Sequence, residues 1–379
     1  MKRNLTLLTD FYELTMMNGY FEDGTHNNEA VFDMFFRYKP DLNYAIFAGL
    51  EQALDYVENL HFGEDEIDYL RSLGSFDERF LDYLKDFKFT GEIYSAVEGE
   101  VVFPGEPILI VKAPLAQAQL LETAILNIIG HQTLIATKTS RIVEAANGKS
   151  VIEFGLRRAQ GPDAGIYGAR ASIIGGCSGT SNVLAAKEFG LSCKGTFAHS
   201  WVMSFGSEIE AFRAYAKLFP DNCLLLVDTY DTLRSGVPNA IKVFDELAAT
   251  GHRPLGIRLD SGDLAYLSKQ ARKMLDEAGY TDAIIFVSGD IDEEVLTALN
   301  IQNAKIDVYG VGTRLITSEK TPSLGGVYKL SRIEIDGVKY DRMKISSTLE
   351  KMTNPGFKKV IRLYDKKTGM AAADLIALK

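Results

Sequence analysis

The chain has 379 residues, of which 46% are hydrophobic and 24% are charged, and its formal net charge is −10. This acidic balance excludes a general attraction to nucleic acid or anionic membranes, and no run reaches the roughly 18 apolar residues that a membrane span needs. The three cysteines are odd in number and form no C-x-x-C pair, which argues against a disulfide framework and a structural zinc site and favours a reducing compartment. We therefore expect a cytoplasmic protein with neither a nucleic-acid nor a membrane partner.

The first third of the chain predicts an α+β domain over residues 1–130. Apolar residues recur at helical spacing over residues 7–20, with Thr9 as the expected cap and Tyr12 in the first turn. Residues 29–38 alternate like a strand. An acidic helical region, a compact antiparallel sheet and a helical pattern broken near Gly130 follow at residues 46–87, 88–113 and 116–146.

Residues 131–325 predict an incomplete, irregular α/β barrel. Six apolar runs each end in a polar or glycine-rich cluster and precede a helical segment. These runs begin at Ser150, Gly195, Asn222, Pro254, Ala283 and Ile306. Asp228, Arg258 and Ser288 follow one another at intervals of 30 residues, about the length of one β-α repeat. Such strands form a parallel sheet, and barrels of this kind carry their active site at the carboxyl ends of the strands, where every polar cluster falls.

The tail, residues 326–379, departs from the barrel rhythm. Residues 326–345 predict a hairpin that turns at Asp336-Gly337, and residues 359–364 predict one further strand. We expect this tail to pack on the N-terminal domain, which is then split between the two ends of the chain.

Arginines and a histidine end the first two runs of the predicted barrel. Arg157 and Arg158 suit a carboxylate or a phosphate, although either could pair with a structural acid such as Glu153. A histidine in an apolar run is often a satisfied core residue. At the chemically active end of a strand, however, the imidazole of His199 can serve as a base or as a phosphate acceptor.

Two acidic pairs follow the next two runs, Asp228 with Asp231 and Asp260 with Asp263. Carboxylates at strand ends can hold ribose hydroxyls or Mg²⁺, whose oxygen shell includes carboxylates and phosphates. Aspartate is also a preferred helix cap, and we expect capping to account for one acid of each pair. Arg258, flanked by these acids, is expected to be held by them with a free edge toward a substrate.

Glycine-bearing clusters end the last two runs, at Ser288-Gly289-Asp290 and at Gly310-Val311-Gly312-Thr313. Late βα loops of barrels often bind phosphate through backbone N–H groups, and glycine allows close approach. The sequence has no G-x-x-x-x-G-K-[ST] loop, no G-x-G-x-x-G after a strand and no H-E-x-x-H. A nucleoside triphosphate would therefore not be held by a P-loop.

Taken in order, these clusters resemble the nicotinate phosphoribosyltransferases over nearly the whole chain. The matching segments are LLTDFYELTM (7–16), EFGLRRAQGPD (153–163), GGCSGTSNVLAA (175–186), GTFAHSWVMSF (195–205), VDTYDT (227–232), RLDSGDL (258–264), SGDID (288–292), GVGTR (310–314) and GGVYKL (325–330). The resemblance implies a type II phosphoribosyltransferase fold, with a split N-terminal domain, an incomplete barrel and a homodimer that shares its active sites.

The resemblance also implies a reaction. The phosphoribosyl group of phosphoribosyl pyrophosphate would pass to nicotinate, giving nicotinate mononucleotide and pyrophosphate for NAD biosynthesis. Mg²⁺ would take part, and ATP hydrolysis would be coupled through a phosphorylated His199.

Roles for single residues follow from the same resemblance. The nicotinate pocket would comprise Tyr12, reaching a neighbouring subunit, with Arg157, Thr196 and Arg258. Asp228 and Asp260 would hold ribose or metal-linked oxygens, and Asp260 with Asp263 would be the metal ligands. The phosphate site would comprise Gly289, Asp290, Gly310, Gly312 and Thr313.

Other functions stay open at this point. Nicotinamide is neutral and favours an acid or amide acceptor, whereas Cys177-Ser178-Gly179 occupies the candidate loop without an acid. Quinolinate has two carboxylates and asks for a denser basic cluster than Arg157, Arg158 and Arg258. A catalytically silent member of the family has no need to keep His199, the arginines and both acidic pairs.

Overall fold

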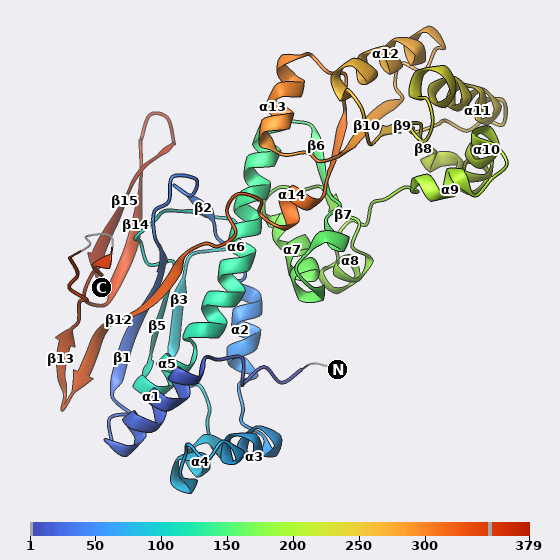
Figure 1. Ribbon diagram of the computed structural model, residues 1–379. Coiled ribbons are helices and arrows are strands. Elements are labelled where there is room, and N and C mark those ends of the chain that lie inside the picture. The colour runs from blue at the N-terminus through green and yellow to red at the C-terminus, as the bar shows by residue number, and fades with distance from the viewer. Residues whose placement is uncertain (1–2, 348–350) are drawn as a thin grey trace. The chain divides into compact units, whose positions relative to one another are not determined.

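The computed structural model describes residues 3–347 and 351–379 and has a mixed α/β fold (Figure 1). Its internal contacts divide the chain into two compact units. The first unit combines the N-terminal residues up to Leu134 with residues 323–379, and the second comprises residues 135–322. The chain passes from the first unit to the second inside helix α6 and returns after Pro322.

An antiparallel sheet in the order β13-β12-β1-β5-β3 forms the frame of the first unit. Its strands are β1 (Glu29–Phe36), β3 (Glu92–Ser95), β5 (Leu109–Pro114), β12 (Gly326–Ile335) and β13 (Val338–Asp341). Strand β12 pairs along β1, so the C-terminal segment extends the sheet that the N-terminal segment begins. The hairpin of β12 and β13 turns at Asp336-Gly337, both with positive φ, which confirms the predicted turn.

Two further strand pairs lie in this unit. Strand β2 (Ala45–Ile46) pairs with β4 (Val101–Val102), and β14 (Lys358–Tyr364) pairs with β15 (Ala371–Leu378). The sequence predicted β14 but not β15. The reason is that β15 begins with three alanines, whose preference for strands is weak, and it acquires its extended form by pairing with β14.

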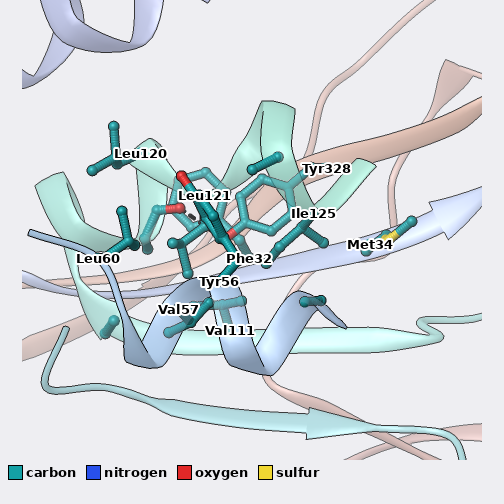
Figure 2. Close-up of a cluster of buried hydrophobic side chains, with 14 of the residues drawn as sticks. Phe32, Met34, Tyr56, Val57, Leu60, Val111, Leu120, Leu121, Ile125 and Tyr328 are labelled. Carbon is teal, nitrogen blue, oxygen red and sulfur yellow. Dashed lines mark hydrogen bonds between the residues drawn. The ribbon is translucent and has the colours of Figure 1, made fainter. Parts of the chain in front are cut away.

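Aromatic and aliphatic side chains between this sheet and its helices form the core of the first unit (Figure 2). The helices are α1 (Phe11–Glu22), α2 (Leu50–Glu58), α3 (Glu64–Ser72), α4 (Glu78–Lys85), α5 (Leu115–Leu120) and α6 (Glu122–Ala145). Phe32 of β1 stacks on Tyr328 of β12 with ring centroids 4.9 Å apart, and the Tyr328 hydroxyl donates to the carbonyl of Ala118 over 2.8 Å. Stacking thus ties together strands from the two ends of the chain.

Two details of these helices differ from the sequence expectation. Helix α6 continues through Gly130, and the interruption lies at Leu121 instead, between α5 and α6. The cost of a helical glycine, about 1 kcal/mol, is offset here because Ile128 and Ile129 beside it are buried. At α1 the capping position is Asp10, while the Thr9 hydroxyl donates to the Glu13 carboxylate.

A parallel sheet in the order β7-β6-β11-β10-β9-β8 forms the frame of the second unit. Its strands are β6 (Ser150–Glu153), β7 (Gly179–Thr180), β8 (Leu224–Leu226), β9 (Gly256–Leu259), β10 (Ile284–Gly289) and β11 (Val308–Val311). The first strand in chain order, β6, pairs with the last, β11. Within the described ranges no ladder joins β7 to β8, so the sheet is open between them.

Helices follow most of these strands. They are α7 (Pro162–Ile174), α8 (Val183–Phe189), α9 (His199–Met203), α10 (Glu208–Leu218), α11 (Val237–Ala249), α12 (Leu264–Glu277), α13 (Glu293–Ile301) and α14 (Thr313–Ile316). In the part of the chain that the structure describes, no helix is both long enough and apolar enough to cross a membrane.

One predicted strand of the barrel is wrong. The run at residues 195–200 is irregular up to Ala198, and His199 begins α9. The sixth strand of the parallel sheet is instead β7, which was not predicted; it lies within the glycine-rich stretch 175–182 and is only two residues long. So short a strand has no alternation that a sequence pattern could reveal. The other five runs form strands β6, β8, β9, β10 and β11.

Candidate active site

A cavity of about 680 Å³ lies at the carboxyl ends of the parallel strands. All of its lining residues belong to the second unit. They are Phe154, Leu156, Arg157, Arg158, Ser181, Gly195, Thr196, Phe197, Ala198, His199, Leu226, Arg258, Asp260, Ser288, Gly289, Asp290, Gly310, Gly312 and Thr313. The predicted clusters meet here because the carboxyl ends of parallel strands share one edge of the sheet.

Arg258 of β9 is held in place by hydrogen bonds from all three of its guanidinium nitrogens. Its Nε donates to Ser288 Oγ over 2.8 Å, and its Nη1 donates to Thr196 Oγ1 over 2.9 Å. Its Nη2 donates to Asp260 Oδ1 over 2.9 Å. The guanidinium carbon also lies 5.5 Å from the centre of the Phe154 ring, within cation–π range. The sequence predicted Arg258 and Thr196 in one pocket, and the structure brings them into direct contact.

Asp260 is the carboxylate that faces this cavity. Its Oδ1 accepts hydrogen bonds from Ser288 and Arg258. Burial would raise the pKa of Asp260, but the hydrogen bond from Ser288, together with the charge and hydrogen bond of Arg258, lowers that pKa below its usual value. Asp260 therefore stays ionised at neutral pH and balances the charge of Arg258.

His199 stands at the start of α9, with 38% of its side chain exposed. Its Nδ1 lies 3.1 Å from the Thr229 hydroxyl. Its Nε2 lies 3.8 Å from Asp260 Oδ2 and 4.0 Å from Asp228 Oδ1. The ring is therefore a cavity-lining group between two carboxylates rather than a buried core residue.

Asp228 is almost completely buried, with 2% of its side chain exposed. Its Oδ2 accepts hydrogen bonds from the Asp260 N–H and the Ser261 hydroxyl, each over 2.8 Å. Its Oδ1 has no hydrogen-bond partner among the described residues. A buried carboxylate oxygen without a hydrogen bond lowers the stability of the fold. Oδ1 of Asp228 is therefore suited to bind a proton donor or a cation on the side where His199 lies.

The second acid of each pair caps a helix, which confirms the capping expectation. Asp231 accepts the N–H groups of Leu233 and Arg234, and Asp263 accepts the N–H of Tyr266 at the start of α12. Across residues 3–347 and 351–379, no group of three or more histidine, cysteine, aspartate or glutamate side chains could hold a metal ion by itself. The role of Asp263 as a metal ligand stays a prediction.

Arg157 and Arg158 lie on a short 3₁₀ turn, Leu156–Arg158, at the rim of the cavity. Within the described part of the chain, neither side chain forms an ion pair. Glu153, the suspected structural partner, is instead buried and accepts hydrogen bonds from the Gly155 N–H and from the Thr180 hydroxyl. Both arginines are thus exposed cations, available to an anionic ligand.

The glycine-bearing loops after β10 and β11 line another part of the cavity. Gly289 has a φ of +124°, a conformation that favours glycine. Gly310 is constrained differently, because a Cβ on it would lie 2.7 Å from the Phe154 ring and 2.9 Å from the Phe286 ring. Gly312 is less crowded, since a Cβ there would first meet the Phe154 carbonyl oxygen at 3.3 Å.

Phe154 is one of the cavity residues that sequence reasoning missed, together with Leu156, Ser181, Phe197 and Leu226. Its ring stacks on Phe286, with centroids 5.6 Å apart and planes inclined by 21°. It directly follows β6 in the EFG segment, and that position at a strand end was the available signal. Tyr12 lies on α1 of the first unit, where 44% of the residue is exposed. Its assignment to the nicotinate pocket stays a prediction.

Known proteins resemble the chain over almost its full length. A model of the nicotinate phosphoribosyltransferase N-terminal domain matches residues 7–130, and a model of the nicotinate phosphoribosyltransferase family matches residues 150–355. A nicotinate phosphoribosyltransferase of Bacillus subtilis (strain 168) is 52% identical over 378 residues, which cover 99% of this chain and 76% of that protein. The Caenorhabditis elegans enzyme of the same name is 39% identical and covers 98% of this chain and 76% of its own.

Solved structures give the same result for the fold. The crystal structure of human nicotinic acid phosphoribosyltransferase superposes with a TM-score of 0.85 at 32% identity, covering 98% of this chain and 81% of that chain. The nicotinate-nucleotide pyrophosphorylase of Pyrococcus furiosus has a TM-score of 0.75 at 23% identity, covering 100% of this chain and 86% of that chain. This second likeness is one of fold alone.

Proposed function

Since the chain belongs to the nicotinate phosphoribosyltransferase family, we propose that it transfers the 5-phosphoribosyl group of phosphoribosyl pyrophosphate to nicotinate. The products are nicotinate mononucleotide and pyrophosphate, and the reaction serves NAD biosynthesis. The observation that carries the proposal is the group of arginines at one cavity, with Arg258 fixed by three hydrogen-bond acceptors and two exposed arginines at the rim.

The base pocket is proposed around Arg258, Thr196 and Phe154. The described hydrogen bonds occupy at most four of the five N–H donors of Arg258, so a donor remains for the nicotinate carboxylate. The Phe154 ring offers a flat apolar face to the pyridine ring. Arg157 lies on the same cavity and adds positive charge. Arg157 has no carboxylate partner among the described residues, so nicotinate would bring it a counter-charge that the neutral nicotinamide lacks, which favours nicotinate.

The reaction requires the protein to position the two substrates and to stabilise the charges that develop on them. The bond between ribose C1 and pyrophosphate breaks while the pyridine nitrogen forms a bond to C1. Positive charge develops on the sugar and negative charge on the departing pyrophosphate. Arg158 is proposed to stabilise the pyrophosphate, and the loops at Gly289 and Gly312 are proposed to hold the 5′-phosphate.

Asp260 fits a role near Mg²⁺ better than Asp228 does. It lines the cavity, stays ionised and keeps Oδ2 on the side of His199, whereas Asp228 is buried. A Mg²⁺ ion typically uses one or two carboxylates together with substrate phosphates, so Asp260 would suffice on the protein side. When bound, such an ion neutralises charge on the pyrophosphate.

The coupling to ATP is proposed to run through a phosphorylated His199. The γ-phosphoryl group would pass to a ring nitrogen, ADP would leave, and the bond to the histidine would later be hydrolysed. Support comes from the partly exposed ring and from the flanking carboxylates of Asp228 and Asp260, whose negative charge can stabilise the positive charge that develops on the ring as it attacks the phosphoryl group.

We further infer an incomplete barrel and a homodimer with shared sites. The pairing of β6 with β11 brings the first and last parallel strands together, as barrel closure requires, and the opening between β7 and β8 makes the barrel incomplete. Tyr12 stands on α1 beside Phe11 and Met16, and all three are exposed apolar side chains that a second subunit could cover.

One assay tests the proposed function. Steady-state turnover is measured with nicotinate, nicotinamide or quinolinate as the acceptor, phosphoribosyl pyrophosphate as the donor, and ATP present or omitted. We expect turnover of nicotinate alone, with ATP raising its rate or lowering its KM. Preferred turnover of nicotinamide or quinolinate would overturn the choice of substrate, and turnover of none would favour a catalytically silent protein.

A further inference from the structure

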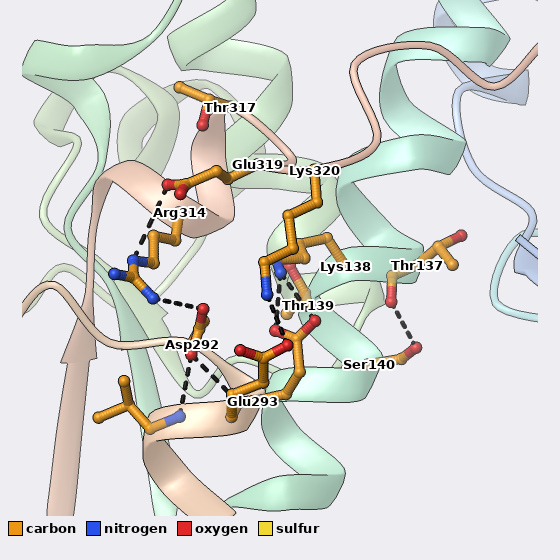
Figure 3. Close-up of polar contacts among 12 residues, drawn as sticks. Thr137, Lys138, Thr139, Ser140, Asp292, Glu293, Arg314, Thr317, Glu319 and Lys320 are labelled. Atoms are coloured by element: carbon orange, nitrogen blue, oxygen red, sulfur yellow. Dashed lines mark hydrogen bonds and ion pairs between the residues drawn. The ribbon is translucent and has the colours of Figure 1, made fainter. Parts of the chain in front are cut away.

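An ion pair joins the residues that follow the two loops proposed to hold the 5′-phosphate (Figure 3). Strands β10 and β11 are parallel neighbours, with Gly289 opposite Val311. Asp292 follows the first loop and Arg314 follows the second. Arg314 Nη1 donates to Asp292 Oδ2 over 2.5 Å, and neither residue lines the cavity.

Both carboxylate oxygens of Asp292 accept hydrogen bonds, which hold the side chain in place. Only 1% of its side chain is exposed, and its Oδ1 accepts the N–H groups of Glu294 and Val295 over 3.1 Å and 2.9 Å, capping α13. Burial would raise the pKa of Asp292, but these backbone hydrogen bonds and Arg314 lower that pKa below its usual value. The carboxylate is therefore ionised and has a single geometry at neutral pH.

A second, partly buried ion pair anchors the same turn of α13. Lys138 of α6 donates to both carboxylate oxygens of Glu293, over 2.8 Å and 2.7 Å (Figure 3). Lys320 pairs with Glu294 on the exposed side of that turn. The start of α13 is thus held against α6, and Arg314 connects the second loop to this fixed point.

We propose that Asp292 and Arg314 are positioning residues that set the separation of the Gly289 and Gly312 loops and so preform the phosphate site. This inference rests on the proposed function, because it concerns the 5′-phosphate of that reaction. Short glycine-bearing loops have several accessible conformations, and phosphate recognition requires N–H groups at one spacing. The ion pair supplies that spacing without touching the substrate.

The position of the ion pair gives the proposal a specific consequence. Loss of the ion pair should weaken ligands that carry the 5′-phosphate and spare ligands that lack it. A purely structural role would instead lower the stability of the second unit and affect every ligand of the cavity alike. A comparison of ligands with and without the 5′-phosphate therefore distinguishes a positioning role of the ion pair from a purely structural one.

The test measures binding of two probes to the full-length protein by calorimetry, nicotinate mononucleotide and the corresponding nucleoside without phosphate. The variants are Arg314→Met, Arg314→Lys and Asp292→Asn, the last of which keeps a side-chain cap for α13. Lys320→Met and Glu294→Gln are matched controls, since they remove an exposed ion pair from the same turn.

We expect Arg314→Met and Asp292→Asn to raise the Kd of the mononucleotide about tenfold, with a smaller rise for Arg314→Lys. The Kd of the nucleoside should stay within about twofold of wild type, and both controls should bind both probes normally. Equal losses for both probes, or no loss for either, would overturn the positioning role. Should Arg314→Met fail to fold, Asp292→Asn decides alone. A wild-type protein that binds no mononucleotide would overturn the proposed function itself, and this inference with it.

Discussion

Arg258 Nη2 donates to Asp260 Oδ1 over 2.9 Å, and the two residues are separated by one position at the end of β9. Residues two apart on a strand point to the same face, so the sequence R-L-D itself places cation and carboxylate side by side. Asp260 then binds Ser288 of the neighbouring strand β10, whose hydroxyl also accepts a hydrogen bond from Arg258. A local pair is thus extended across the sheet into a fixed network at the cavity.

Arg258→Ala is expected to lower nicotinate turnover at least a hundredfold, about 2.7 kcal/mol in the transition-state barrier, while the protein remains folded. The change removes the proposed carboxylate ligand and leaves Asp260 without its counter-charge. Turnover and near-ultraviolet circular dichroism are measured together. Arg213→Ala is the control, since it breaks a solvent-exposed ion pair with Glu246, a kind of contact that contributes little to stability. Near-normal turnover by Arg258→Ala would remove this residue from the site.

His199→Ala is expected to abolish the uptake of acid-labile phosphate from γ-labelled ATP. The reason is that His199 lines the cavity between two carboxylates and is the proposed acceptor. His252→Ala is the matched control, because His252 has the same 38% exposure and also lies beside an aspartate, Asp221. Uptake that is equal in wild type and His199→Ala would show that the phosphohistidine assignment is incorrect.

Glu153→Gln is expected to stabilise the protein increasingly as the pH rises. Burial raises the pKa of Glu153, although hydrogen bonds from Thr180 and Gly155 oppose the effect. Because this pKa is higher in the folded state, folding favours the protonated acid. The stabilisation that the protonated Glu153 contributes is therefore fully present below the ordinary glutamate pKa of about 4.3. It is lost as the pH rises through the higher pKa that Glu153 has in the folded protein.

The glutamine never ionises, and its Oε1 can still accept the Gly155 N–H while its Nε2 donates to the Thr180 hydroxyl, which reverses the direction of that second hydrogen bond. Urea unfolding of both proteins at several pH values between about 4 and 8 measures the difference in free energy of unfolding. A difference that stays constant over this range would mean that Glu153 does not titrate there. A difference of the opposite sign would mean that the carboxylate is favoured by folding.

The strands of the second unit could be predicted from sequence because each is a short apolar run that ends in polar residues. Position along the chain then placed Arg258, Asp260 and Ser288 at one edge. His199 was placed on a strand incorrectly, since the phenylalanine and alanine before it are equally compatible with an irregular segment. Strand β7 was not predicted because it consists of only two residues, a glycine and a threonine, which are too few to show an alternation of apolar and polar side chains.

Contacts between distant segments could not be predicted in the same way. Glu153 was considered as a partner for the arginines, yet its carboxylate turns inward to Thr180, 27 residues further along the chain. Phe154 was overlooked because an aromatic residue beside a strand end is usually a core residue. The ion pair of Asp292 and Arg314 depends on the adjacency of β10 and β11, which only the strand order reveals.

Gly310→Ala distinguishes the two roles that Gly310 can have. The new methyl group would lie 2.7 Å from the Phe154 ring and 2.9 Å from the Phe286 ring, so the Phe154 ring must move. We therefore expect the KM for nicotinate to rise about tenfold, since a lost aromatic contact is worth about 0.5–1.5 kcal/mol. The KM for phosphoribosyl pyrophosphate should change less than about twofold, because the phosphate loop itself is not displaced.

Two further variants complete this test. Phe154→Leu should reproduce the effect of Gly310→Ala, because it removes the same ring face from the base pocket. Gly312→Ala places a methyl group at the phosphate loop, with its nearest contact the Phe154 carbonyl oxygen at 3.3 Å, and should raise the KM for phosphoribosyl pyrophosphate instead. If Gly310→Ala raises the KM for phosphoribosyl pyrophosphate and spares that for nicotinate, Gly310 contacts the phosphate. Its packing against Phe154 would then be incidental to substrate binding.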